Sequence, residues 1–210
     1  MKKSLIGILF AYSLSCHSIS AQIQAVTSKG DEVLLYDDGT WKYTSKPKAA
    51  STIETNAKEF KKSPASTFLV KSNVVNAGVF LNPALWEFKK ADTHESAEFQ
   101  FKFKEKDAYA LLIPERIEIP LETLRNLALE NAKNVAPDIR IVQEEYRIVN
   151  GKKVLMMRMD GTLQGIKFSY LGYYYAGENC TIQFLTYTSS NLMNEYRKEL
   201  EDLLNGFMIQ

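Results

Sequence analysis

Histidine and cysteine are scarce in this chain, with two residues of each among 210. Cys16 and His17 lie near the amino terminus, which leaves His94 and Cys180 for the remainder. A transition-metal site needs several His or Cys ligands, so the sequence contains no candidate metal site of that kind. A single cysteine beyond the amino-terminal segment also excludes a disulfide within the main part of the chain.

Charge of one sign is not in excess either. The chain has 26 Lys and Arg residues against 25 Asp and Glu residues, a formal net charge of +1 at pH 7. Removal of a segment that carries Lys2 and Lys3 would bring the net charge to about −1. Binding to nucleic acid or to an anionic membrane surface depends on positive charge, so we expect no nucleic-acid partner.

Long apolar runs are missing as well. The apolar stretch from Leu5 to Leu14 has about ten residues, well short of the roughly 20 needed to span a bilayer. It follows Lys2 and Lys3 and precedes small residues that end at Ala21, which is the order of a secretory signal peptide. We therefore expect residues 1–21 to be removed. The mature protein would have no transmembrane segment and would be periplasmic or secreted.

Cys16 raises one alternative, a lipoprotein signal in which a lipid is attached to this cysteine. A lipobox has Leu or a similar apolar residue three positions earlier, where this chain has Ser13. His17 follows the cysteine. The sequence favours ordinary cleavage after Ala21 over lipidation.

Residues 22–44 form a unit of their own in the sequence pattern. Short β-type runs are separated by two breaks, 28–31 and 37–39, whose Gly and Asp residues favour turns. We expect a small three-stranded β-meander here. From 45 to 66 the composition shifts to Lys, Ala, Ser, Thr and Pro with little periodicity, which predicts a linker.

Residues 67–210 carry the pattern of a larger domain. Phe99, Phe101 and Phe103 alternate with polar residues, as in a half-buried strand. Apolar residues at helical spacing between Pro120 and Pro137 predict a helix. Four further strands with short turns between them are expected at 138–149, 153–163, 167–176 and 181–188.

A second helix is expected to close the chain. Leu192, Tyr196, Leu200 and Phe207 lie on one stripe, and Ser189-Ser190 precede it as a cap. Strands and helices do not alternate along this domain, which indicates the α+β class. We expect an antiparallel β-sheet with helices packed on it, preceded by the small meander.

The mature part contains no catalytic constellation. His94 lies in a polar segment without an orienting partner nearby in sequence, so we interpret it as a solvated side chain. Glu144 and Glu145 are adjacent on a strand and point to opposite faces, which prevents joint action on one bond. The run 37–40 is too short for a calcium loop and is typical of a turn. Strand parity places Cys180 in the core.

Tyrosines form the most suggestive surface feature. They gather on the strand at 167–176 and on the next one, and either pack across strands or form a recognition surface. The residues of this candidate interaction surface are Tyr170, Tyr173, Tyr175 and Tyr187. No catalytic, cofactor-binding or metal-binding residue is predicted.

Two resemblances follow from these patterns. Residues 22–43, with the run Asp37-Asp38-Gly39-Thr40-Trp41, resemble a short element at the start of many exported Bacteroidetes proteins. Residues 67–208 resemble the PsbP-like fold through Trp86 and the strand after it, the helix after Pro120, the Gly-punctuated meander and the closing helix. This resemblance implies binding or assembly without catalysis and carries over no site residues or cofactor.

The leading hypothesis is an exported, non-enzymatic accessory protein that binds a protein partner or an envelope component. The first alternative is an envelope hydrolase or transferase whose site forms only in three dimensions. The second is a carrier of a small apolar ligand. A deep pocket with converging polar side chains would favour the enzyme, a shallow aromatic surface the binding protein, and an enclosed apolar cavity the carrier.

Overall fold

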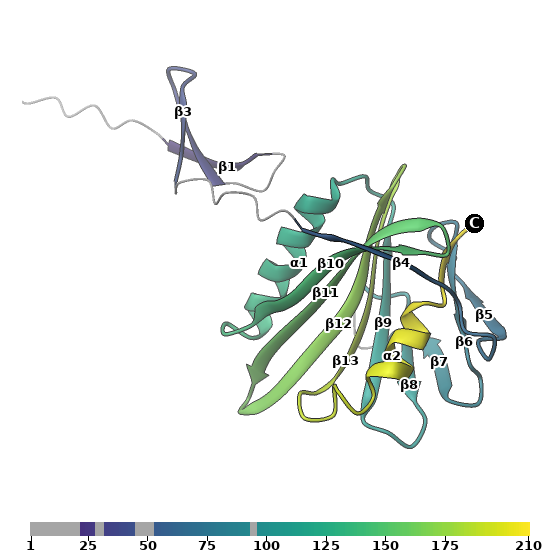
Figure 1. Cartoon of the computed structure of the whole chain (residues 1–210). Helices are drawn as coiled ribbons and strands as arrows, with labels where there is room; N and C mark the ends of the chain where they lie inside the picture. Colours follow the sequence, from purple (N-terminus) through teal and green to yellow (C-terminus); the bar gives the residue numbers. More distant parts are fainter. Residues whose placement is uncertain (1–21, 28–31, 45–52, 93–95) are drawn as a thin grey trace, which may run out of the picture. The chain divides into compact units, whose positions relative to one another are not determined.

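The structure, a computed structural model, describes residues 22–27, 32–44, 53–92 and 96–210 (Figure 1). The expected signal peptide, with Cys16 and His17, and the loop histidine His94 lie outside the described residues. The chain divides into a small unit that contains the first three strands and a main unit that extends to Gln210. The described residues form mostly β-sheet, with two helices.

The small unit is a three-stranded antiparallel sheet of β1 (Gln22–Val26), β2 (Glu32–Tyr36) and β3 (Trp41–Tyr43), in that order. A tight turn joins β2 to β3, where Gly39 adopts a φ of 79°, a value that favours glycine. Asp38 stabilises this turn by accepting hydrogen bonds from the backbone and hydroxyl of Thr40 at 2.8 and 2.6 Å. The run 37–40 is thus a turn, as its length predicts.

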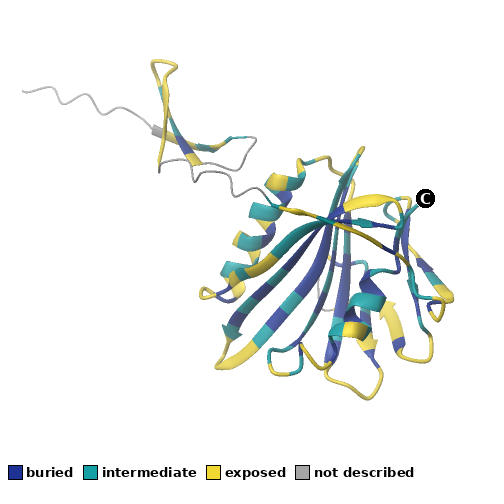
Figure 2. Cartoon of the chain, viewed as in Figure 1, coloured by how far each residue is buried: buried dark blue, intermediate teal, exposed yellow. Residues whose placement is uncertain are grey.

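An eight-stranded sheet organises the main unit. Its strand order is β4-β10-β11-β12-β13-β9-β8-β7, and all neighbouring pairs are antiparallel except β4 with β10. The central strands are buried along much of their length (Figure 2). The bounds are β4 Thr55–Phe60, β7 Trp86–Lys90, β8 Phe99–Phe103, β9 Ala108–Glu115, β10 Arg140–Val149, β11 Lys152–Leu163, β12 Ile166–Gly177 and β13 Cys180–Ser189.

A second, three-stranded sheet accompanies the large one. It consists of β5 (Phe68–Lys71), β6 (Ala77–Leu81) and β14 (Phe207–Ile209), with β6 in the middle. Val70, Val79 and Phe207 from its three strands belong to the same buried cluster as Phe101 and Phe184 of the large sheet. The two sheets therefore share one hydrophobic core.

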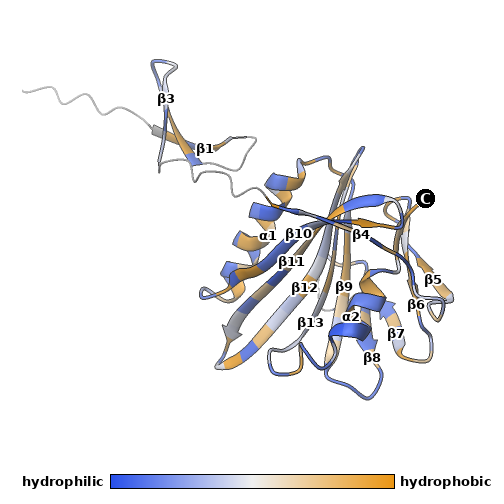
Figure 3. Ribbon diagram, viewed as in Figure 1, coloured by the Kyte–Doolittle hydropathy of each residue, from blue (hydrophilic) through white to orange (hydrophobic). Residues whose placement is uncertain are grey.

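The two helices contact opposite faces of the large sheet. Helix α1 (Leu121–Val135) alternates apolar and polar residues (Figure 3), and its buried Leu124 and Ala128 cluster with Leu155, Met157 and Tyr174. We call the sheet surface that carries these three residues the α1 face. Helix α2 (Arg197–Leu204) buries three leucines in the cluster that contains Met156, Tyr173 and Phe184 of the opposite surface, the α2 face. The leucines are Leu200, Leu203 and Leu204.

Two segments differ from their expected structure. Part of the expected linker 45–66 is strand β4, which pairs in parallel with β10 and buries Phe60. The polar sequence of β4 does not indicate a strand, because most of its side chains are exposed and no apolar alternation is needed. The final helix has eight residues and begins after its N-cap Tyr196. Ser189 belongs to β13 and Ser190 lies well before the helix, so the expected cap Ser189-Ser190 is wrong. Phe207 lies in β14 instead of the helix, yet it is buried.

Candidate functional site

The four tyrosines of the candidate surface lie on two different faces of the sheet. Tyr173 and Tyr175 lie on the α2 face, where Tyr173 is buried and 1% exposed. Tyr170 and Tyr187 are cross-strand partners on the α1 face and are half-buried. Strand alternation separates residues 170 and 173, so these four residues do not form one surface. Tyr173 in particular is a core residue.

Tyr187 belongs to an aromatic row that crosses three strands of the α1 face. Its ring stacks on Tyr109 of β9 with centroids 5.4 Å apart and an interplanar angle of 24°. On the other side, the Tyr170 ring meets Tyr187 at 5.9 Å, and Phe168 meets Tyr170 at 5.1 Å, both edge to face. Sequence reasoning missed Tyr109, because its place beside Tyr187 depends on the pairing of β9 with β13, strands far apart in the sequence.

A groove of about 350 Å³ runs beside the stacked pair, on the part of the sheet formed by β7, β8, β9 and β13. Side chains of Glu87, Lys89, Gln100 and Lys102 line it together with Tyr109 and Tyr187, because these positions share the α1 face. Phe88 and Phe101 also line the groove. We call these eight residues the tyrosine groove.

The phenol groups in the aromatic row stay protonated at neutral pH. Burial raises the pKa of Tyr109, and the neighbouring carboxylate of Asp107 raises it further. Burial is also the main cause of the raised pKa values of Tyr187 and Tyr170. Each hydroxyl can therefore both donate and accept a hydrogen bond. With Lys89 and Lys102 as cations and Glu87 as an anion, the groove combines aromatic surface with charges of both signs.

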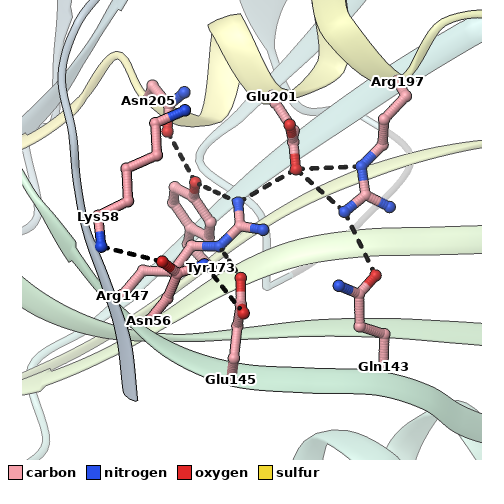
Figure 4. Close-up of polar contacts among 9 residues, drawn as sticks. All are labelled: Asn56, Lys58, Gln143, Glu145, Arg147, Tyr173, Arg197, Glu201 and Asn205. Atoms are coloured by element: carbon pink, nitrogen blue, oxygen red, sulfur yellow. Dashed lines mark hydrogen bonds and ion pairs between the residues drawn. The ribbon is translucent and has the colours of Figure 1, made fainter. Parts of the chain in front are cut away.

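A polar cluster on the α2 face offers a second place for chemistry (Figure 4). At its centre the buried Arg147 of β10 donates to Glu145 at 2.6 Å, to Glu201 of α2 at 3.1 Å and to the Tyr173 hydroxyl at 3.2 Å. The Tyr173 hydroxyl donates in turn to Asn205 at 2.7 Å. Burial raises the pKa of Tyr173 to about 12, although the positive charge of Arg147 acts in the opposite direction. The phenol is consequently neutral.

The surrounding residues complete this network. Asn56 of β4 donates to Glu145 at 3.1 Å, and the Arg197 guanidinium binds Glu201 at 3.0 Å. Two arginines thus meet two carboxylates, and the charges balance within the cluster (Figure 4). The network ties β4, β10, β12 and α2 together. Its groups bind one another, so we interpret it as a structural network.

The adjacent carboxylates of β10 separate as the sequence predicts. Glu145 takes part in the Arg147 network on the α2 face. Glu144 accepts two hydrogen bonds from the Arg125 guanidinium of α1, at 2.5 and 2.8 Å, on the α1 face. Glu144 joins α1 to the sheet, whereas Glu145 joins β4 and β10 within the sheet through Asn56 and Arg147.

Cys180 is not the core residue that strand parity predicts. It is the first residue of β13 and pairs with Gly177 across the hairpin turn, where the sheet ends and burial is incomplete. Its thiol is half-buried, and its pKa is raised, chiefly by burial and then by the charge of Glu118. The parity is correct, since Ile182 and Phe184 are buried, but the position at the strand end leaves the thiol partly exposed.

Two other kinds of site, a metal centre and a membrane span, have no candidate among the described residues. Nowhere in the part of the chain that the structure describes do three or more His, Cys, Asp or Glu residues group so that they could hold a metal ion. Neither helix among these residues is long and apolar enough to cross a membrane. The tyrosine groove and the Arg147 network are thus the two arrangements of interest.

Comparison with known proteins identifies the fold. No protein-family model and no curated protein matches the chain. Among solved structures, PsbP (CyanoP) from Synechocystis sp. PCC 6803 matches with a TM-score of 0.56 and 10% identity, over 70% of this chain and 95% of that one. LpqN of Mycobacterium tuberculosis, described as involved in cell envelope biogenesis, matches with a TM-score of 0.50 and 8% identity, over 68% and 90%. The chain therefore has a PsbP-like fold, as the sequence pattern beyond residue 67 predicts.

Proposed function

We propose that the chain is an exported, non-enzymatic accessory protein that binds a protein partner or an envelope component through the tyrosine groove. The observation that carries this proposal is the stacked pair of Tyr109 and Tyr187, which lies half-exposed in a groove of about 350 Å³. Tyrosines are enriched at interfaces because a large apolar ring and a polar hydroxyl share one rigid side chain.

The Arg147 network and the tyrosine groove differ in how many of their polar groups can bind a ligand. In the Arg147 network the guanidinium donates to two carboxylates and one phenol, so most of its hydrogen-bonding capacity is used within the protein. In the groove, Lys102 and Glu87 are exposed and form no ion pair with any described residue. This difference supports the groove as the binding site.

The shape of the groove favours a binding protein over the two alternatives. An enzyme would bring polar groups together at one reacting atom, whereas the charged and amide groups of the groove are spread over β7 and β8 along a sheet surface. A carrier of an apolar ligand would need an enclosed apolar cavity, whereas four side chains of this groove are charged or amide groups. LpqN, with the same fold, is described as involved in cell envelope biogenesis, which is compatible with a role in the envelope.

Affinity capture from envelope extract tests this proposal. The bait is the protein from Gln22 onward, compared with the double variant Tyr109→Ala/Tyr187→Ala. The control is Tyr175→Ala, which removes a half-buried tyrosine from the opposite face. Circular dichroism verifies that all baits are folded. We expect the wild type and the control to retain the same partner and the double variant to lose it. Equal retention by all three baits would exclude the groove as the binding site.

A further inference from the structure

Strand β7 forms one edge of the eight-stranded sheet. Its one strand neighbour in the described part of the chain is β8, with Trp86 opposite Phe103 and Lys90 opposite Phe99. An edge strand presents unpaired backbone groups that can pair with another chain. Soluble proteins protect such edges with charges, so the charge pattern of β7 decides what can pair with it.

The hydrogen bonds at both ends of β7 determine which backbone groups point outward. The Leu85 carbonyl accepts a hydrogen bond from the Lys104 N–H at 2.9 Å, and the Ala91 N–H donates to Glu98 at 3.0 Å. In an antiparallel pair, every second residue of a strand bonds to the neighbouring strand through its backbone N–H and C=O. The backbone groups that bond to β8 are therefore those of residues 85, 87, 89 and 91. The backbone groups of 86, 88 and 90 therefore face the open edge. The Trp86 N–H is already bonded to Asn82, which leaves the N–H groups of Phe88 and Lys90 as the outward donors without a backbone partner among the described residues.

The side chains beside this free segment carry charges of opposite sign. Glu87 and Lys89 lie on the α1 face, two positions apart, with Phe88 between them on the other face. Under a two-fold axis at Phe88, an antiparallel second copy places its Lys89 opposite Glu87 and its Glu87 opposite Lys89. Opposite charges at directly facing positions stabilise a strand pair, and like charges destabilise it.

Other registers do not give this match. A two-fold axis at Lys90 would place Lys90 opposite Lys90, and an axis at Lys89 would place Lys89 opposite Lys89, so both registers bring like charges together. The edge also carries exposed apolar side chains that a second copy would cover. Phe88 is 39% and Leu85 37% exposed, and Phe68 of β5, 47% exposed, contacts the Phe88 ring at 5.6 Å.

We propose that two copies of this chain associate through β7, antiparallel and centred on Phe88, to form one continuous sheet. Lys89 pairs with Asp92 within the monomer at 2.6 Å, but both side chains are 58% exposed, and such surface pairs contribute little. This pair does not prevent Lys89 from facing Glu87 of the second copy. A two-fold axis perpendicular to the sheet keeps the α1 faces on the same side.

Dimerisation would change the geometry of the tyrosine groove. Glu87 and Lys89 line that groove, so the grooves of the two copies would lie side by side across the new strand pair. A ligand that follows the sheet surface could then contact both copies. The dimer itself does not depend on the proposed function, because its charges and backbone groups lie in β7 and not on the tyrosines.

Analytical ultracentrifugation over a wide concentration range tests the inference with three charge variants, Glu87→Lys, Lys89→Glu and the double exchange Glu87→Lys/Lys89→Glu. Each single variant turns both facing pairs into like-charge pairs, so we expect the dissociation constant of the dimer to rise about tenfold or more. The double exchange restores opposite charges and should restore dimerisation. An equimolar mixture of the two single variants should form mixed dimers for the same reason.

Several outcomes would overturn the inference. The inference is wrong if the wild type stays monomeric at all concentrations, or if the single variants dimerise as well as the wild type. It is also wrong if the double exchange remains monomeric although its melting temperature is unchanged. Since both side chains are exposed, the variants should fold normally, and circular dichroism verifies this. Tyr109→Ala/Tyr187→Ala serves as the matched control and should dimerise like the wild type, which separates this test from the test of partner binding.

Discussion

The guanidinium carbon of Arg147 lies 4.2 Å from the centroid of the Phe60 ring. This contact joins β10 to β4, the parallel strand at the edge of the large sheet. Cation–π contacts of this kind are stronger when the cation is desolvated, and Arg147 is 4% exposed. Phe60 and Asn56 both reach the Arg147 network, so this cluster fastens β4 to the sheet.

Removal of the Arg147 charge should destabilise the protein markedly. Arg147→Met leaves Glu145 and Glu201 without their common partner, at side-chain exposures of 20% and 26%. We expect the free energy of unfolding to fall by about 2 to 4 kcal/mol, somewhat less than for fully buried pairs because of this exposure. Urea unfolding measures the change. Lys198→Met, which breaks an exposed pair with Asp202, is the control and should leave the free energy of unfolding almost unchanged. Equal stability of the two variants would contradict a structural role for Arg147.

Leu200 should be among the most sensitive core positions. Its side chain is fully buried between α2 and the sheet, in the cluster with Tyr173 and Phe184. Leu200→Ala should lower the free energy of unfolding by about 2 to 5 kcal/mol, because it removes buried surface and leaves a cavity. Thermal and urea unfolding both report this loss. Lys198→Ala on the exposed side of the same helix is the matched control, and a melting temperature of Leu200→Ala equal to the control would show that α2 is not anchored in the core.

Alkaline pH should weaken the protein through Tyr173. The folded state raises the pKa of this phenol from 10.0 to about 12, chiefly by burial, so folding favours the protonated form. This contribution to stability is complete below pH about 10 and is lost as the pH rises toward 12. Unfolding free energies measured across this window should fall for the wild type and fall less steeply for Tyr173→Phe. Parallel decline of both proteins would rule out Tyr173 as a contributor.

Local patterns predicted the regular parts of the fold. The helix after Pro120 follows from apolar residues at helical spacing, and the four strands from residue 138 onward follow from apolar runs separated by turn residues, although β11 and β12 are buried on both faces. Strand β4 lacks such a pattern, since most of its residues are exposed and its partners lie in β10. The stripe through Phe207 suggested a longer helix, because burial in a neighbouring strand can continue an apolar pattern after a helix has ended.

The candidate site was less accessible to sequence reasoning than the fold. Tyr170 and Tyr187 were identified because they lie on consecutive strands. Tyr109 reaches them only through the β9–β13 pairing, and Arg147 meets Glu201 only because α2 crosses the sheet there. Such contacts join residues far apart in sequence, and no local spacing encodes them. The alternation of residues along a strand correctly assigned side chains to the two faces of the sheet. It does not show which end of a strand is exposed, and Cys180, at the first position of β13, is therefore only half-buried.

The three-stranded sheet closes with residues from the far end of the main unit. Strand β14 pairs with β6, and Asn76 donates to the Gln210 carbonyl at 2.9 Å across 134 positions of sequence. Contacts so distant in sequence are slow to form, since a long loop must close first. During synthesis, β5 and β6 are made long before β14 exists, and β6 then has an unpaired edge. The native packing of this sheet is therefore completed only after residues 207–209 have been synthesised and have reached β6.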